Sequence, residues 1–230
     1  MTIFDSRQLR NQQGVFEDRR DAGQKLAALL ASHEKKLDAI LAVPAGGVPV
    51  AVEMGKRLQL PVDVAVVSKA TFPWTTEAGF GAVAFDSTTR LNEPLVRQAG
   101  LTDREISTAV AEAKAKVERR VKKFHRTHPF PELCEKNVVL VDDGLASGFT
   151  MQVAVEAVCK ANPARTVVAV PTAHESSLDH LQNSVDAIYC CNIRGGQRFA
   201  VASAYLHWRD VTEQEAVGLI ANPSGTSLTP

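Results

Sequence analysis

Several features that identify common classes of protein are missing from this 230-residue sequence. No apolar stretch approaches the roughly 20 residues that a transmembrane helix needs, and residues 1–20 lack the apolar core of a secretory signal. The 26 Lys and Arg residues balance 26 Asp and Glu residues, so the net charge provides no general attraction for nucleic acid or an anionic membrane. We therefore expect a cytoplasmic globular protein that binds neither a membrane nor a nucleic acid.

The four cysteines also form no recognisable pattern. Cys134, Cys159, Cys190 and Cys191 show no CxxC spacing, which suits a reducing compartment better than a disulfide framework. Cys190 and Cys191 end an apolar run, so we expect them to be buried thiols of a strand, with a redox or metal role as the alternative.

The sequence does contain a regular alternation of apolar runs and amphipathic stretches. Near-continuous apolar strands joined by helices are typical of a parallel sheet that is covered on both faces. The expected fold class is therefore α/β, a mostly parallel sheet flanked by helices, in a single domain over residues 1–230. Strands are expected at about 39–43, 62–67, 138–141, 166–170 and 187–191, and helices at about 21–32, 48–58, 101–125, 175–181 and from 212.

The most informative segment runs from Val138 to Thr150. Four apolar residues are followed by two adjacent acids, Asp142 and Asp143, then by a loop of small residues and the start of a helix. A helix start presents unpaired N–H groups and a partial positive charge to a phosphate. Carboxylates at a strand end accept hydrogen bonds from sugar hydroxyls or hold a divalent cation. This order predicts a site for a phosphorylated sugar, and the alternative is that the two acids only cap a turn.

The loop after the two acids does not match the common nucleotide-binding motifs. It lacks the Gly-Lys-Ser/Thr ending of a P-loop, and it lacks the GxGxxG pattern of a Rossmann site. Acids that directly precede a phosphate loop favour a ligand whose ribose hydroxyls lie next to its own 5′-phosphate.

Two more loops are predicted at the same carboxyl edge of the sheet, where ligands bind in such folds. One is the glycine loop at residues 44–47, and the other begins at residue 68. Residues 69–93 show no helical period and contain Pro73, Gly79, Gly81 and one short strand candidate at 82–85. Because this segment is long for a connection inside a compact domain, it is typical of a lid or a disordered loop.

The segment from Val138 to Thr150 resembles the ribose-phosphate signature of the type I phosphoribosyltransferases. Ser147 stands where that family often has Thr, which keeps the hydroxyl. The resemblance is to a bacterial branch without a settled base substrate, and it covers most of residues 14–220. The matching stretches are 16–23, 44–49, Lys69, 81–83, 138–150 and 199–208. The resemblance implies a core over about 16–192, a flexible loop over about 70–93, and a small hood formed by that loop and the termini, including a C-terminal segment at about 193–220.

The resemblance also implies a role for each part of the site. Lys69 is implied to neutralise pyrophosphate charge, although an ordinary surface lysine is the alternative. The implied catalytic residues are Asp142, Asp143 and Lys69. The implied ribose-5-phosphate-binding residues are Asp142, Asp143, Gly144, Ala146, Ser147, Gly148, Phe149 and Thr150. The implied pyrophosphate-binding residues are Ala45, Gly46, Gly47 and Lys69. The substrate is implied to hold most of the Mg²⁺ coordination, with Asp142 and Asp143 as the implied protein ligands. The alternative is that Asp143 acts as a base toward the incoming ring.

One departure from the family pattern concerns the diphosphate. Ala45 stands where this branch commonly has Arg before the two glycines, so one cation is lost from the pyrophosphate side. That loss weakens diphosphate binding or indicates a ligand with fewer phosphates.

The implied activity is Mg²⁺-dependent displacement of pyrophosphate from 5-phosphoribosyl 1-diphosphate by a nitrogen nucleophile, with a nucleobase as the expected acceptor. The alternatives are a non-catalytic sensor of phosphoribosyl diphosphate or of a nucleotide, and a hydrolase or phosphorylase that acts on a related phosphosugar. The expected partners are phosphoribosyl diphosphate and a base that the sequence does not identify, and a homodimer is left open. Aromatic residues that either stack on that base or pack in the protein are Trp74, Phe80, Tyr205 and Trp208.

Overall fold

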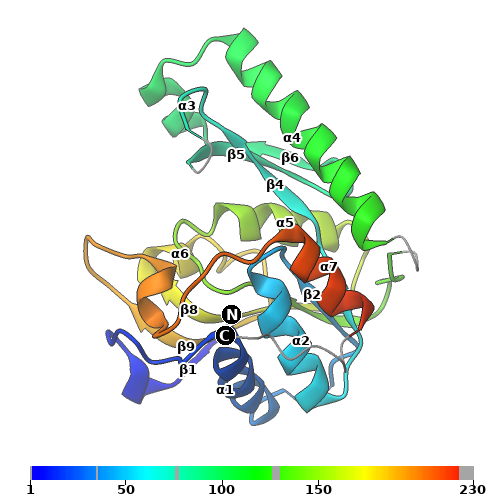
Figure 1. The fold of residues 1–230 in the computed structure, drawn as a ribbon, viewed down its shortest axis with the longest axis vertical. Helices are drawn as coiled ribbons and strands as arrows, with labels where there is room; N and C mark the ends of the chain where they lie inside the picture. Colours follow the sequence, from blue (N-terminus) through cyan, green and yellow to red (C-terminus); the bar gives the residue numbers. More distant parts are fainter. Residues whose placement is uncertain (1, 35, 76–77, 126–129, 223–230) are drawn as a thin grey trace.

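The structure is a computed structural model that describes residues 2–34, 36–75, 78–125 and 130–222 (Figure 1). The strands of the main sheet are β1 (Thr2–Asp5), β2 (Ala39–Ala42), β3 (Val62–Val64), β7 (Asn137–Val141), β8 (Arg165–His174) and β9 (Ala187–Arg194). These described strands are parallel and lie in the order β1-β9-β8-β7-β2-β3. The predicted α/β class with a mostly parallel sheet is therefore confirmed.

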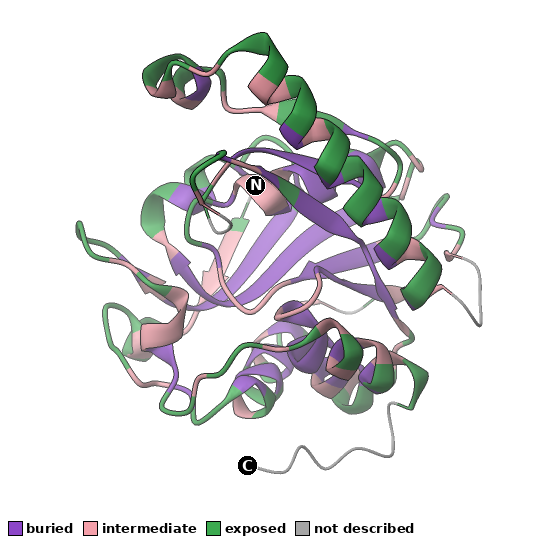
Figure 2. Ribbon diagram, turned by 45° about the horizontal axis from the view of Figure 1, so that its top comes forward, coloured by how far each residue is buried: buried purple, intermediate pink, exposed green. Residues whose placement is uncertain are grey.

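Helices cover both faces of the main sheet (Figure 1). On one face lie α1 (Arg19–Ala31), α2 (Gly47–Leu58) and α7 (Glu213–Ala221), and on the other lie α5 (Phe149–Cys159) and α6 (Glu175–Asp179). Successive side chains of a strand point to opposite faces, so Val139 and Val141 join the core under α1 and α2. Val138 and Leu140 join the core under α5. β7 is therefore buried on both sides, as its continuous apolar run predicts. Figure 2 shows that the strands at the centre of the molecule are largely buried.

A second layer rises above the carboxyl edge of the main sheet (Figure 1). It is an antiparallel sheet of β4 (Val67–Thr71), β5 (Gly79–Ala84) and β6 (Thr89–Leu91). A short helix α3 (Glu93–Ala99) leads to the long helix α4 (Asp103–Phe124), which packs on β4 and β5. Thr102 and Glu105 form the predicted capping box at the start of α4.

The segment expected as a flexible loop at 70–93, with one strand candidate at 82–85, therefore contains the end of β4 and all of β5 and β6. Residues 76 and 77 of it lie outside the described residues. The glycines that favoured a loop have another cause. A Cβ on Gly81 would lie 2.7 Å from a side-chain carbon of Leu91 and 2.9 Å from the carbonyl oxygen of Arg90. Glycine is there because β6 approaches closely, not because the chain turns. A closing movement of this segment stays a prediction.

Two segments that are far apart in the sequence, residues 14–16 and 203–206, run side by side. Gly14 N donates to Ser203 O (2.9 Å), Phe16 N to Ala204 O (3.0 Å) and Leu206 N to Phe16 O (2.8 Å). This region also contains two short 3₁₀ helices, η1 (Arg7–Leu9) and η2 (Val201–Ala204). Of the helices described, none is both long enough and apolar enough to cross a membrane.

Cys190 and Cys191 are buried in β9, and all four cysteines are free thiols. Burial raises the pKa of Cys190 well above its usual value and that of Cys191 to about 12. The prediction of buried strand thiols is confirmed.

Candidate functional site

The end of β7 and the start of α5 are joined by the loop at residues 142–148. Leu145 attaches this loop to the extended end of β8, because Leu145 N donates to Thr172 O and His174 N donates to Leu145 O, both at 2.9 Å. Gly148 precedes the first helical residue with a φ of 72°, a left-handed conformation that glycine adopts without strain. The neighbouring strand therefore fixes the position of this loop.

The same loop contains backbone N–H groups that have no protein acceptor. In the described part of the chain, the backbone N–H groups of Ala146, Ser147, Gly148 and Thr150 donate to no protein acceptor. Phe149 N reaches only the hydroxyl of Ser147, at 3.4 Å. Unpaired N–H groups at a helix start suit a phosphate, so the geometry agrees with the sequence-based expectation, although their role stays a prediction.

The two acids lie side by side and are largely buried. Asp143 N donates to Asp142 Oδ1 at 2.8 Å. Burial raises the pKa of Asp142 well above its usual value, and the charge of Asp143 adds to this effect. Burial also raises the pKa of Asp143, although the guanidinium of Arg19 opposes it. Since desolvation and mutual repulsion disfavour the charged pair, a cation that arrives between these carboxyls is favoured electrostatically.

The glycine loop between β2 and α2 packs directly on these acids. A Cβ on Gly46 would lie 2.1 Å from Asp143 Oδ2, and a Cβ on Gly47 would lie 2.7 Å from Val141 O. The Pro44–Ala45 peptide bond is cis. Any side chain at these two glycines would displace the acids, so the structure brings the expected pyrophosphate loop and the expected ribose site together.

Lys69 lies in β4 and is exposed. It lines a cavity of about 320 Å³ together with Pro44, which lies just after β2, and Thr150, which lies in the first turn of α5. Its charge also opposes the burial and the Asp143 charge that raise the pKa of Asp142. The second layer therefore carries Lys69 to the same edge as the two loops from the main sheet.

Sequence reasoning missed the most important partner of the acidic pair, which is Arg19. Its Nε donates to Asp143 Oδ2 at 2.9 Å, and its Nη2 lies 2.8 Å from the same oxygen. Its Nη1 donates to Arg209 O at 2.7 Å, and its guanidinium carbon lies 3.8 Å from the ring centroid of Trp208. Arg19 occurs in one of the stretches that resemble the family, but no local pattern distinguishes it from Arg20.

The aromatic residues divide between packing and exposure. Tyr205 is buried and donates its hydroxyl to Asp143 O at 2.6 Å, and Trp208 stacks on Arg19. Phe80 is fully buried, so it is a core residue rather than one that stacks on a base. Trp74 is 66% exposed and stacks on Phe72 with a centroid distance of 5.1 Å.

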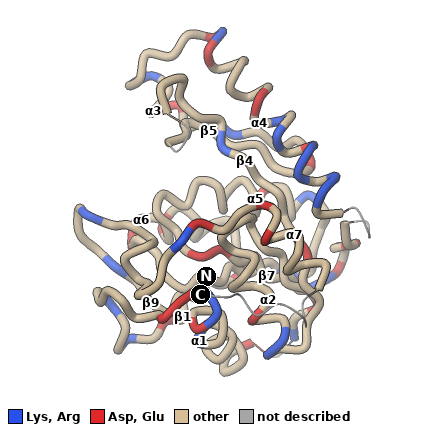
Figure 3. The backbone as a smooth tube through the Cα atoms, in the orientation of Figure 1, with Lys and Arg blue, Asp and Glu red and all other residues tan. Residues whose placement is uncertain are grey.

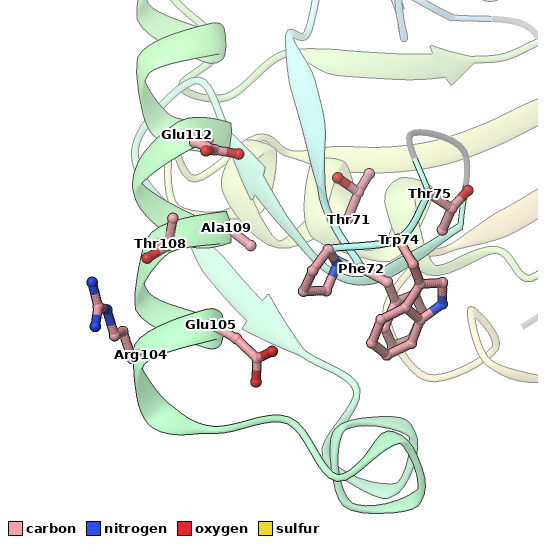
Figure 4. Close-up of a pocket in the computed structure, with 10 residues that line it drawn as sticks. Thr71, Phe72, Trp74, Thr75, Arg104, Glu105, Thr108, Ala109 and Glu112 are labelled. Atoms are coloured by element: carbon pink, nitrogen blue, oxygen red, sulfur yellow. The ribbon is translucent and has the colours of Figure 1, made fainter.

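Trp74 lines a second, larger cavity of about 1020 Å³ between the β4–β5 connection and α4 (Figure 4). Glu105 and Glu112 extend from α4 toward this cavity. Thr71 lines both the larger and the smaller cavity, so they are neighbours along β4. Arg104 also lines the larger cavity, so its lining carries two carboxylates and one cation, whereas the described lining of the smaller one carries cations alone.

Among the residues whose structure is described, no three or more His, Cys, Asp or Glu side chains converge to hold a metal ion. Mg²⁺ usually retains several waters and takes one or two carboxylates plus substrate phosphates. Asp142 and Asp143, a buried pair with an unfavourable negative charge, fit that kind of site.

Comparison with known proteins gives consistent matches. A family model described as the phosphoribosyl transferase domain matches residues 16–204. A provisionally named phosphoribosyl transferase of Mycobacterium tuberculosis, found in two strains, is 32% identical over 206 residues, which are 90% of this chain and 46% of that protein. The chain therefore spans about half the length of the curated relatives it matches. The crystal structure of TT1426 from Thermus thermophilus is 31% identical, covers 91% of this chain and 99% of its own, and superposes with a TM-score of 0.71.

Proposed function

Because the chain belongs to the phosphoribosyl transferase domain family, we propose that it is an enzyme that uses 5-phosphoribosyl 1-diphosphate as its donor. A nitrogen nucleophile, with a nucleobase as the expected acceptor, displaces pyrophosphate from C1 of the ribose. The observation that supports this most is the meeting of the acidic pair with the glycine loop, since a Cβ on Gly46 would lie 2.1 Å from Asp143.

The unpaired N–H groups at residues 146–148 and 150 bind the 5′-phosphate, with the hydroxyls of Ser147 and Thr150. Asp142 and Asp143 accept hydrogen bonds from the ribose 2′- and 3′-hydroxyls. The diphosphate then extends toward Gly46, Gly47 and Lys69, where backbone N–H groups and a cation stabilise it. These residues hold the donor with C1 open to the acceptor.

In the reaction, the bond between C1 and the diphosphate oxygen breaks, and its electron pair leaves with the diphosphate. A bond from the acceptor nitrogen to C1 forms, and the proton of that nitrogen is released. The transition state resembles an oxocarbenium ion, so stabilisation of the leaving diphosphate lowers the barrier. The protein contributes placement and charge rather than a covalent intermediate.

Mg²⁺ belongs to this proposal because the buried acids carry an unfavourable negative charge. Asp142 and Asp143 would contact the ion directly or through water, and the ion would neutralise diphosphate charge when bound. A cytoplasmic location is also part of the proposal, and the four free cysteines support it.

A non-catalytic sensor of phosphoribosyl diphosphate or of a nucleotide is the second candidate. Ala45 supports it, since the glycine loop itself offers no cation to a diphosphate. In a sensor, the ligand would bind with no turnover and would change the binding of a partner.

The experiment is a Mg²⁺-dependent assay of pyrophosphate release from phosphoribosyl diphosphate with a panel of bases and amines. Asp142→Asn and Asp143→Asn should each lower the rate at least about 100-fold. Asp103→Asn, an exposed carboxylate at the start of α4, is the matched control and should retain the rate. Tight donor binding without release for any acceptor would favour the sensor, and no donor binding would refute both candidates.

A further inference from the structure

We propose that Lys116 and Arg120, on the second-layer helix α4, bind the diphosphate of the donor and supply the positive charge that Ala45 does not. This inference rests on the proposed function, because that function identifies the bound group as a diphosphate. Neither residue lies in a segment that the sequence connected with the site.

The cavity of about 320 Å³ at the carboxyl edge brings these residues to the site. Its wall includes Pro44 at the start of the glycine loop and Thr150 in the first turn of α5. Lys69 lines it from β4, and Lys116 and Arg120 line it from α4. Four segments of the chain, the glycine loop, β4, α4 and α5, therefore surround one space.

The charges around this space have one sign. Lys69, Lys116 and Arg120 line it, and none of the described residues that line it is a carboxylate. Three cations around one cavity repel one another unless an anion lies between them. A diphosphate carries several negative charges and matches this arrangement, whereas a neutral base or sugar does not.

Lys116 has no other electrostatic function that the structure records. Across residues 2–34, 36–75, 78–125 and 130–222 it forms no ion pair and no side-chain hydrogen bond. Arg120 is only partly committed: its Nη1 donates to Val67 O at 3.3 Å, and its Nε lies 3.1 Å from Glu213 Oε2. The Nε is buried and makes no well-aligned hydrogen bond. Within the described residues Nη2 forms no hydrogen bond, so that nitrogen is the one that can donate to a further anion.

Helix geometry explains why these two residues act together. Positions four apart lie on one face of a helix, and Lys116 and Arg120 both line the cavity. Most of the Lys and Arg residues of α4 lie in its second half, where the tube is largely blue (Figure 3). Lys114 is also exposed on α4. It is therefore a control: it carries the same charge on the same helix but does not line the cavity.

The neighbouring larger cavity supports the direction of the diphosphate. Glu105 and Glu112 line that cavity and Thr71 separates it from the basic one. The larger cavity has two carboxylates and one cation, Arg104, whereas the smaller one has three cations and no carboxylate, so the smaller cavity attracts a diphosphate more strongly.

The experiment is titration calorimetry of the full chain with three probes in the presence of Mg²⁺: ribose 5-phosphate, pyrophosphate and phosphoribosyl diphosphate. The variants are Lys116→Ala, Lys116→Arg and the control Lys114→Ala. Lys116→Ala should weaken pyrophosphate and phosphoribosyl diphosphate about five- to ten-fold and leave ribose 5-phosphate within about two-fold. Lys116→Arg should restore most of the affinity, and the salt dependence of pyrophosphate binding should fall in Lys116→Ala.

Arg120→Lys gives a second reading, with its melting temperature measured because Arg120 also contacts Glu213. It should weaken the same two probes while the protein stays folded. If Lys116→Ala and Lys114→Ala bind all three probes alike, the inference is wrong and the proposed function survives. If the unmodified protein binds pyrophosphate through Lys116 but neither sugar phosphate, the diphosphate site stands and the donor assignment fails. Binding of none of the probes would overturn both.

Discussion

The ion pair between Arg19 and Asp143 carries the most specific prediction for stability. The side chains of Arg19 and Asp143 are only 10% and 15% exposed, and two guanidinium nitrogens approach one carboxylate oxygen. Replacing Arg19 by Met keeps much of the side-chain volume but leaves Asp143 buried and unpaired beside Asp142. Removal of one partner of a buried pair commonly costs about 3–5 kcal/mol. We expect the lower end, ~3 kcal/mol, because Asp143 can take up a proton.

The free energy of unfolding that Arg19→Met loses should increase with pH. Burial already raises the pKa of Asp143 although Arg19 opposes it, so removal of Arg19 raises it further. A carboxyl with a raised folded pKa binds its proton more tightly in the folded state than in the unfolded chain. Its destabilising effect is absent below the unfolded pKa, near 3.9, and grows as the pH rises through the folded pKa. Arg19→Met loses the contacts with Arg209 O and Trp208 at every pH, so its loss of stability should be smallest, but not zero, near pH 4 and largest above pH 7.

The assay is thermal and urea denaturation between pH 4 and pH 8. A loss of ~3 kcal/mol corresponds to a decrease in melting temperature of roughly 6–12 °C for a domain of this size. Arg20→Met is the matched control, because Arg20 is exposed and adjacent, and it should change stability by less than about 0.5 kcal/mol. Equal losses for Arg19→Met at pH 4.5 and pH 7.5, or a loss no greater than that of Arg20→Met, would refute the reasoning.

Three further predictions concern the same cluster. Gly46→Ala should displace the Asp143 carboxylate, because Oδ2 would lie 2.1 Å from the new Cβ. Donor affinity should fall more than about ten-fold. Gly218→Ala is the control: a Cβ there would meet nothing within 4 Å, so denaturation should show no change or a gain of ~0.5–1 kcal/mol. Tyr205→Phe removes the hydroxyl that donates to Asp143 O at 2.6 Å and should cost about 1–3 kcal/mol, because a buried carbonyl loses its partner; an unchanged melting temperature would contradict this. Asp142→Asn should raise the melting temperature at pH 7 while abolishing turnover, since a carboxyl with a raised pKa costs stability when ionised; a variant that melts lower at pH 7 would show that the buried charge is already compensated.

The elements that the sequence predicts well are those whose signal is local. The apolar run at 138–141 and the acids and small residues after it define a strand, a loop and a helix start without reference to the rest of the chain. Of the second sheet, the sequence predicts only a strand at 82–85, within and just after β5, because Gly79 and Gly81 favour a loop. The reason for Gly81 is the close approach of Leu91, which exists only after folding.

The site shows the same division between local and long-range information. The glycine loop and the acidic pair were each identified from short patterns, and the structure brings them into contact. Arg19 and Asp143 are 124 positions apart, and no spacing rule connects residues at that distance. Lys116 and Arg120 lie in the helix expected at 101–125, which no sequence pattern connects with the site, and only the packing of α4 on β4 brings them to the cavity.

The two acids are not equivalent, and the difference bears on their chemistry. Asp143 is fixed from two directions, by Arg19 at its carboxylate and by Tyr205 at its carbonyl oxygen. Asp142 forms no ion pair within the described chain and accepts a hydrogen bond from Asp143 N. Burial raises the pKa of both carboxyls, and the charge of Arg19 opposes the rise at each of them. Only Asp143 accepts hydrogen bonds from that guanidinium, so its carboxylate is held in one position. Neighbouring carboxyls in unlike environments can take different roles, and the role of Asp143 as a base toward the incoming ring stays a prediction.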